Sequence, residues 1–253
     1  MTIELRRLAP AAAQAWATLF DLAEESPDSW ILVGGQMILL LALEHGEDSV
    51  RPSQDMDIVV NVRVRPDGTR WLSAWLEARG FDLEGINRDQ IGHRFVKAAV
   101  GGQGNVVIDV LAPAGVCERA RLTTIPPART VQAPGALQAF ARSRLVDILI
   151  SDSRDGNERR GSAKCPDILG ALVLKAAATS IPLRENADRD WQDAAFLLSI
   201  IADPFGTAER VVKRDRHHLC RLRPLLDESH AGWTGVNPQA RLRGAAALSF
   251  LID

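Results

Sequence analysis

Two aspartates separated by one residue, Asp55 and Asp57, are the side chains whose spacing most clearly suggests chemistry. They open an apolar run that predicts a β-strand, and a strand places both carboxylates on the same face. Neighbouring carboxylates raise each other's pKa unless a cation lies between them. A hard divalent ion suits such oxygens, so the pair is a candidate Mg²⁺ or Mn²⁺ site. Taken alone, an Asp-x-Asp pair is more often two solvated charges at a strand end.

A third aspartate, Asp109, lies inside the apolar run of residues 106–111, which also predicts a strand. A single charge in such a strand is costly to bury without a partner. A metal held by Asp55 and Asp57 would be that partner. The alternative is an exposed position at the edge of the sheet.

Gly34 and Gly35 lie between an expected strand, residues 30–33, and an expected apolar helix, residues 36–46. Glycine allows a sharp turn and the close approach of a phosphate to the free N–H groups at a helix start. A glycine pair in a turn is common, so this signal is weak alone. Arg51 and Ser53, just before the acids, are suited to phosphate oxygens or to an ordinary surface loop.

Lys175 lies on the apolar stripe of a helix that opens at Pro166 and Asp167. It either extends its ammonium to the surface or offers a point charge to a triphosphate. In either case we expect Met at this position to fold at least as well as Lys. Asp190 and Asp193 share a face of the next helix, where acids in a first turn can also be simple dipole partners.

The elements expected around these side chains alternate between helix and strand. A helix is predicted from Pro10 through Glu25, and the segment 67–80 forms another. Further strands are expected over 81–86 and 93–100, with a glycine-rich hairpin turn before the Asp109 strand. Additional expected features are a proline- and glycine-rich connection over 112–135, a hairpin from Leu145 towards Lys164 with its turn at 155–157, and a basic stretch over 206–223 that is a candidate nucleic-acid patch.

Composition places the chain among ordinary globular proteins. It has 253 residues, 46% hydrophobic and 25% charged, with a formal net charge of -2 that gives no global attraction to nucleic acid. Three cysteines without a CxxC pair argue against a zinc motif and are typical of a reduced, cytoplasmic protein. Polar residues interrupt the Ala-rich N-terminal run, so an amphipathic helix is expected there, with no export signal and no membrane span.

The combination of Gly34-Gly35, Asp55-x-Asp57 and Asp109 on a later strand resembles the nucleotidyltransferase superfamily typified by DNA polymerase β. More narrowly, GGQMILLLALEHGEDSVRPSQDMDIVV resembles the toxin branch of the abortive-infection type (AbiEii-like, MenT-like), with its His, Arg-x-Ser/Thr and Asp-x-Asp sequence. The gap between the glycine pair and the first aspartate is long for the superfamily.

Lys175 and the stretch RDWQD, which contains Asp190 and Asp193, look like the later Lys and Asp motifs of that toxin branch. The resemblance spans roughly residues 30–200, and either aspartate could take the motif position. It implies an α+β fold with a polymerase β-like core, in which a mixed sheet is flanked by helices, and a helical C-terminal region. The expected domains are a nucleotidyltransferase core over 1–128 and a β-hairpin plus mainly helical domain over 129–253.

The activity that the resemblance implies is transfer of a nucleoside monophosphate from an NTP to a hydroxyl, with Mg²⁺ or Mn²⁺ as cofactor. Asp55 and Asp57 would bind metal, Asp109 would bind a second metal or accept the hydroxyl proton, and Asp190 would orient Lys175 or the nucleoside. Contacts to the nucleotide are implied for Gly34, Gly35, Arg51, Ser53, Lys175 and Asp193. The acceptor would be a tRNA 3′ end or a protein, restrained by a cognate antitoxin.

Two other functions remain open at this point. The same chemistry could modify a small molecule such as an aminoglycoside, which would require an acidic substrate cleft. The chain could also be a catalytically silent nucleotide-binding or scaffold module, although only chemistry requires a third carboxylate. Resemblance of fold alone does not decide between them.

Overall fold

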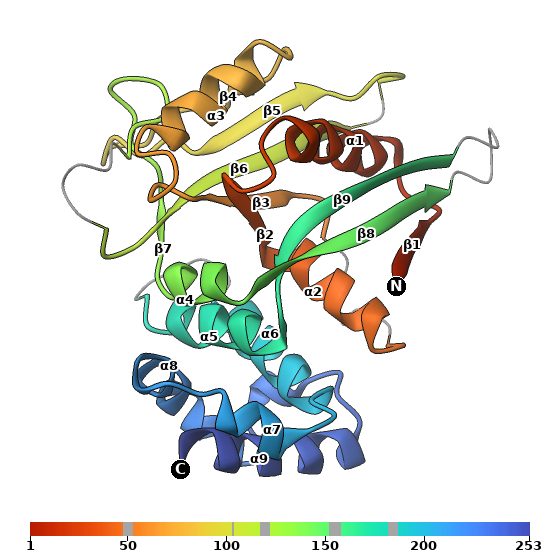
Figure 1. The fold of residues 1–253 in the computed structure, drawn as a ribbon, viewed down its shortest axis with the longest axis vertical. Helices are drawn as coiled ribbons and strands as arrows, with labels where there is room; N and C mark the ends of the chain where they lie inside the picture. Colours follow the sequence, from red (N-terminus) through yellow and green to blue (C-terminus); the bar gives the residue numbers. More distant parts are fainter. Residues whose placement is uncertain (48–52, 103, 117–121, 152–157, 182–186) are drawn as a thin grey trace.

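The protein is described here by a computed structural model that covers residues 1–47, 53–102, 104–116, 122–151, 158–181 and 187–253. It has an α+β fold with two mixed sheets flanked by helices, as Figure 1 shows. The predicted fold class is therefore confirmed at this level, while the specific polymerase β-like core stays a prediction. Arg51 and the expected turn at 155–157 lie outside the described residues.

The larger sheet has the strand order β2-β3-β6-β5-β4, with β7 paired to β6 at one end. Strand β3 is parallel to β6, whereas β2–β3, β5–β6 and β4–β5 are antiparallel, so the sheet is mixed. The bounds of its strands are β2 Trp30–Val33, β3 Met56–Val60, β4 Asp82–Leu83, β5 Arg94–Ala98, β6 Asn105–Pro113 and β7 Gln132–Ala133.

The register of this sheet aligns three charged residues on neighbouring strands. Asp57 on β3 lies opposite Asp109 on β6, and Asp109 lies opposite Arg94 on β5. Partners in register project from the same face of a sheet. The sheet therefore presents a row of acid, acid and base across three strands.

A second sheet of three strands, in the order β1-β8-β9, contains β1 (Thr2–Arg6), β8 (Ser143–Ser151) and β9 (Glu158–Pro166). Strands β8 and β9 form the expected hairpin. Strand β1 was not predicted from the sequence, and it pairs in parallel with β8. The smaller sheet therefore contains strands from both sides of residue 128, the predicted domain boundary. The boundary itself stays a prediction.

The five helices predicted individually from the sequence lie close to their expected positions, whereas the helices over 136–141, 204–209, 213–219 and 238–252 were not individually predicted. Helix α5 begins after Asp167, whose carboxylate accepts a bond from the Gly170 N–H at 2.9 Å and so caps the helix. The bounds are α1 Pro10–Glu25, α2 Gly34–Glu44, α3 Gly68–Glu77, α4 Ala136–Ala141, α5 Ile168–Ala178, α6 Ala187–Ser199, α7 Pro204–Glu209, α8 Lys213–Leu219 and α9 Pro238–Ile252, with 3₁₀ helices η1 Cys220–Leu226 and η2 Ala231–Trp233.

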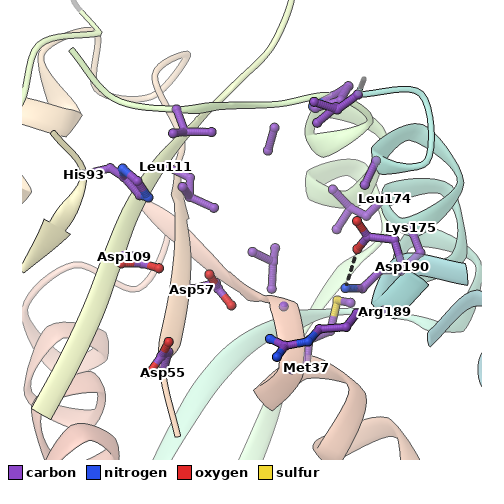
Figure 2. A pocket seen from close by; sticks show the side chains of 18 of the residues that line it. Met37, Asp55, Asp57, His93, Asp109, Leu111, Leu174, Lys175, Arg189 and Asp190 are labelled. Atoms are coloured by element: carbon purple, nitrogen blue, oxygen red, sulfur yellow. Dashed lines mark hydrogen bonds and ion pairs between the residues drawn. The ribbon is translucent and has the colours of Figure 1, made fainter. Parts of the chain in front are cut away.

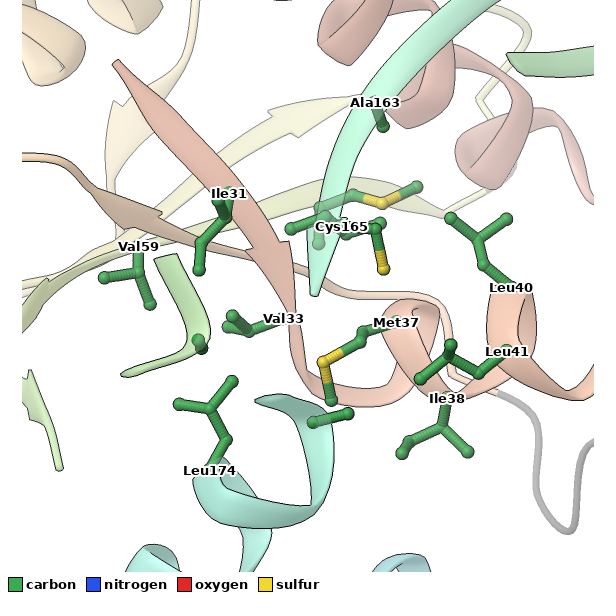
Figure 3. Close-up of a cluster of buried hydrophobic side chains, with 14 of the residues drawn as sticks. Ile31, Val33, Met37, Ile38, Leu40, Leu41, Val59, Ala163, Cys165 and Leu174 are labelled. Atoms are coloured by element: carbon green, nitrogen blue, oxygen red, sulfur yellow. The ribbon is translucent and has the colours of Figure 1, made fainter. Parts of the chain in front are cut away.

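Helix α2 is the element that ties the larger sheet to α5. Its side chains Met37, Ile38 and Leu41 are buried in an apolar cluster with β2, β9 and Leu174 of α5 (Figure 3). Each such side chain contributes about 1.5–3 kcal/mol when fully removed from water. This packing fixes the distance between the row of charges on the sheet and helix α5.

The C-terminal helices α7, α8 and α9 gather at one end of the molecule, and α4 and α5 lie between them and the strands (Figure 1). Trp233 is fully buried at this end, and its indole N–H donates to the Leu225 carbonyl at 3.1 Å. Helix α6 packs against both α5 and α9 and so connects the two parts. In the described part of the chain, every helix is too short or too polar to cross a membrane.

Candidate active site

A cavity of about 460 Å³ lies between the charged row of the larger sheet and the helices α5 and α6. Figure 2 shows Asp55, Asp57 and Asp109 on its sheet side and Lys175 with Asp190 on its helix side. The sequence-predicted residues that line it are Gly34, Gly35, Ser53, Asp55, Asp57, Asp109, Lys175 and Asp190. Asp193 is not among the lining residues, although it contacts Lys175.

The glycine pair interlocks with the segment that carries the acids. Gly34 has φ +66°, and a Cβ there would lie 1.8 Å from Oδ2 of Asp57. A Cβ on Gly35 would lie 2.4 Å from Cβ of Ser53. The side-chain amide of Gln36 donates to the Ser53 carbonyl at 2.6 Å. These positions need glycine because the neighbouring side chains occupy the space that a Cβ would take.

Asp109 is buried, at 5% exposure, so the alternative of an exposed edge position is wrong. Both of its oxygens accept bonds from Arg94: Nε donates to Oδ1 at 2.9 Å and Nη2 to Oδ2 at 2.8 Å. The structure thus supplies an arginine where the sequence analysis expected a metal as partner. This ion pair and the hydrogen bonds raise the pKa of the Arg94 guanidinium above its ordinary value, despite the opposing effect of burial.

Asp55 lies just before β3 and shares the same guanidinium. Nη2 of Arg94 donates to its Oδ2 at 3.1 Å, and the Asp55 side chain is 42% exposed. Partial burial raises the pKa of Asp55, and the charge of Asp109 raises it further, while Arg94 opposes both effects. A carboxylate whose charge is disfavoured in this way gains from any additional cation.

Lys175 lies on the helix side of the cavity in an ion-pair cluster with two aspartates. Its Nζ lies 3.1 Å from Asp190 Oδ1 and 2.7 Å from Asp193 Oδ2, and all three side chains are at most 10% exposed. Burial lowers the pKa of Lys175, but the two carboxylates outweigh it, so the net pKa is raised. The expectation that Met would fold as well as Lys here overlooked these partners, because it treated the stripe as wholly apolar.

Three ionisable lining residues were missed by the sequence analysis: His93, Arg94 and Arg189. Arg94 had a signal, because counting pairs back from the glycine-rich hairpin turn places it opposite Asp109. Arg189 is exposed and directly precedes Asp190 in the RDWQD stretch. Burial lowers the pKa of His93, which favours a neutral imidazole near pH 7.

Asp55 and Asp57 are suitable ligands for Mg²⁺, which takes one or two carboxylates together with water and phosphate oxygens. Within the described ranges, no three His, Cys, Asp or Glu side chains are close enough together to hold a metal by themselves. Arg94 binds both oxygens of Asp109 in this structure, so Asp109 could join a metal site only if that guanidinium moved away. The donor chemistry therefore fits a metal shared with a phosphate-bearing ligand.

Two comparisons with known proteins found no match. No protein-family model matches the sequence, and no curated protein matches it. The cavity is therefore interpreted from its own side chains and geometry.

Proposed function

We propose that this protein is a Mg²⁺-dependent nucleotidyltransferase that moves a nucleoside monophosphate from an NTP to a hydroxyl acceptor. The observation that carries the proposal is that one cavity is lined by the Asp55-x-Asp57 pair, the Gly34-Gly35 pair and the Lys175–Asp190 ion pair. These groups come from three distant parts of the chain. Each supports a different requirement of phosphoryl transfer.

The cavity supports binding of a nucleotide. Its volume of about 460 Å³ is within the range of small-molecule sites. Gly35 lies in the first turn of the 11-residue helix α2, where free N–H groups and the helix dipole favour phosphate. Arg189, exposed at the cavity, adds a positive charge that is suited to phosphate oxygens.

In the proposed reaction, the acceptor oxygen forms a bond to the α-phosphorus of the NTP. The bond from that phosphorus to the bridging oxygen of the β-phosphate breaks, and pyrophosphate leaves with the electron pair. The hydroxyl proton passes to a carboxylate of the sheet side. A bound divalent ion would neutralise the charge that develops on the phosphoryl oxygens.

The acceptor proposed from the family resemblance is a tRNA 3′ end or a protein hydroxyl, and the physiological role is that of a toxin with a cognate antitoxin. In the basic stretch over 206–223, Arg210 is compensated by an ion pair, and two other arginines make hydrogen bonds. Arg210 pairs with Asp167, Arg216 donates to the Asp253 carbonyl, and Arg221 donates to Ser180. Hydrogen bonds of this kind leave the charges of Arg216 and Arg221 in place, so the stretch stays a candidate nucleic-acid patch.

A polycationic acceptor such as an aminoglycoside receives less support. Among the described lining residues, the four aspartates are accompanied by Arg94, Lys175 and Arg189, so the cavity is not strongly acidic. Electrostatic complementarity would favour an anionic or neutral acceptor here. We therefore keep RNA or protein as the proposed acceptor.

The proposal is tested by incubating the purified protein with each α-³²P-labelled NTP, Mg²⁺ and one of three acceptors: cellular RNA, cellular protein or an aminoglycoside. We expect label on one class of acceptor and an equal amount of pyrophosphate, with both lost in Asp57→Asn. Label on a small molecule alone would favour the second enzymatic function. NTP binding by calorimetry without any transfer would support the silent module and contradict the proposal.

A further inference from the structure

One guanidinium nitrogen lies between the two carboxylates that flank the candidate metal position. Nη2 of Arg94 is 2.8 Å from Asp109 Oδ2 and 3.1 Å from Asp55 Oδ2. Those distances are typical of charge-assisted hydrogen bonds. A Mg²⁺ ion would need the same oxygens at about 2.0–2.1 Å. A metal that takes these oxygens therefore competes with the guanidinium for them.

Partial exposure to solvent allows Arg94 to leave the cluster, because the side chains of Arg94 and Asp55 are 40% and 42% exposed. Only Asp109, at 7% side-chain exposure, is deeply buried and depends on a nearby cation. Arg94 itself lines the cavity. Once displaced, its guanidinium stays beside the space in which phosphate oxygens would be its strongest partners.

We propose that Arg94 is an exchangeable counter-ion of the carboxylate cluster, which neutralises Asp109 and Asp55 until a divalent metal displaces it. The inference rests on the proposed metal-dependent function and names a residue that sets the metal affinity of that site. Arg94 makes the metal compete for its ligands, so the metal-free protein is stable and binds metal weakly. A metal accompanied by a triphosphate overcomes this competition, because the phosphates provide new partners for the arginine.

A matched control exists elsewhere in the fold. Arg142 pairs with Asp215, which is fully buried, and neither residue lines the cavity. Removing either arginine leaves a buried aspartate without its ion-pair partner, which destabilises a protein. Only at Asp109 would a divalent ion be able to replace the lost charge. The control therefore separates a general loss of an ion pair from a specific exchange with metal.

The test is direct binding of Mn²⁺, followed by the electron paramagnetic resonance signal of the free ion, with thermal melts in EDTA and in Mn²⁺. We expect Arg94→Met to bind Mn²⁺ roughly tenfold or more tightly than wild type, because a nearby positive charge is removed. We also expect its melting temperature to fall in EDTA and to recover in Mn²⁺. Arg142→Met should be destabilised equally with and without Mn²⁺.

If Arg94→Met does not fold without metal, Arg94→Lys provides the same comparison. A single ammonium cannot hold both oxygens of Asp109 and also reach Asp55, so we expect a smaller gain in Mn²⁺ affinity that still exceeds wild type. Equal or weaker Mn²⁺ binding in both Arg94 variants would overturn the inference and leave the metal site itself intact. Absence of Mn²⁺ binding in all of the proteins, wild type included, would overturn the metal-dependent function as well.

Discussion

The two sides of the cavity each contain a cluster of aspartates around a shared cation, yet these clusters are built in different ways. On the sheet side, Arg94 and Asp55 are about two-fifths exposed, and only Asp109 is buried. On the helix side, the side chains of Lys175, Asp190 and Asp193 are all at most 10% exposed. A partly exposed pair can exchange its counter-charge with a solute, whereas a buried pair is fixed by the cost of separating its charges.

This difference assigns distinct tasks to clusters that look alike in composition. The sheet side is suited to binding and releasing a charged ligand. The helix side is suited to holding α5 and α6 together and to presenting one edge of a fixed ion pair to the cavity. Substitutions on the two sides should therefore affect different observables.

The largest expected effect on folding is that of Lys175→Met. It removes the cation that contacts both Asp190 and Asp193 in a buried cluster, so the free energy of unfolding should fall by about 3–5 kcal/mol. Urea denaturation followed by circular dichroism measures this. Lys164→Met is the matched control, since Lys164 pairs with the exposed Asp28, and it should cost less than about 1 kcal/mol. Equal losses in the two variants would erase the contrast between the sides.

The corresponding change on the sheet side, Asp57→Asn, should affect chemistry and leave folding nearly intact. Volume is conserved and a charge of the proposed metal site is lost, so we expect the proposed nucleotide transfer to fall by roughly a hundredfold or more, about 3 kcal/mol in transition-state stabilisation. Initial rates with labelled NTP and melting curves test both parts. Wild-type rates in the purified variant would remove Asp57 from the proposed metal site.

A smaller effect is expected from Gly34→Ala. The new Cβ would clash with the Asp57 carboxylate at a position with φ +66°, so the variant should lose about 2 kcal/mol of stability and displace the acid. Gly46→Ala is a control near the other end of α2, with φ +73° and no neighbour within 4 Å. It reports the backbone cost alone, about 1 kcal/mol. Equal melting temperatures of the two variants would show that the close contact between Gly34 and Asp57 does not limit the residue at position 34.

The smallest expected effect is the pH dependence of the helix-side cluster. Because the pKa of Lys175 is raised above 10.5 in the folded protein, its stabilising contribution is complete below that pH and is lost as the pH rises through the folded value. The gap in stability between wild type and Lys175→Met should be constant from pH 7 to about 10 and should narrow above it. Denaturation curves at several pH values measure the gap. A gap that narrows between pH 7 and 9 would show that Lys175 titrates early.

Much of the sheet side could be predicted from the sequence, because its signals are local. The spacing of Asp55 and Asp57 and the position of Gly34 and Gly35 before an apolar helix depend on periods of two and 3.6 residues. The hairpin that carries Asp109 was also recognised from its glycine-rich turn. Arg94 was missed because its position opposite Asp109 becomes visible only when the strand pairing is counted back from that hairpin turn.

The helix side could be predicted only in part, for a different physical reason. The stripe around Lys175 and the shared face of Asp190 and Asp193 are visible within each helix. The ion pairs between them depend on how α5 packs against α6. The spacing of residues within one helix does not determine that packing. The same limit explains why strand β1 was missed, since its pairing partner lies far along the chain.

The parallel pairing of β1 with β8 has a consequence for how the protein is made. Thr2 lies opposite Asp147, so roughly 145 residues must leave the ribosome before the first strand finds its neighbour, a delay of roughly 7–30 s at ordinary rates of synthesis. During that interval Ile3 and Leu5, both buried in the finished fold, have no partner strand to cover them. The smaller sheet is therefore completed late in synthesis, after all the described strands of the larger sheet have been made.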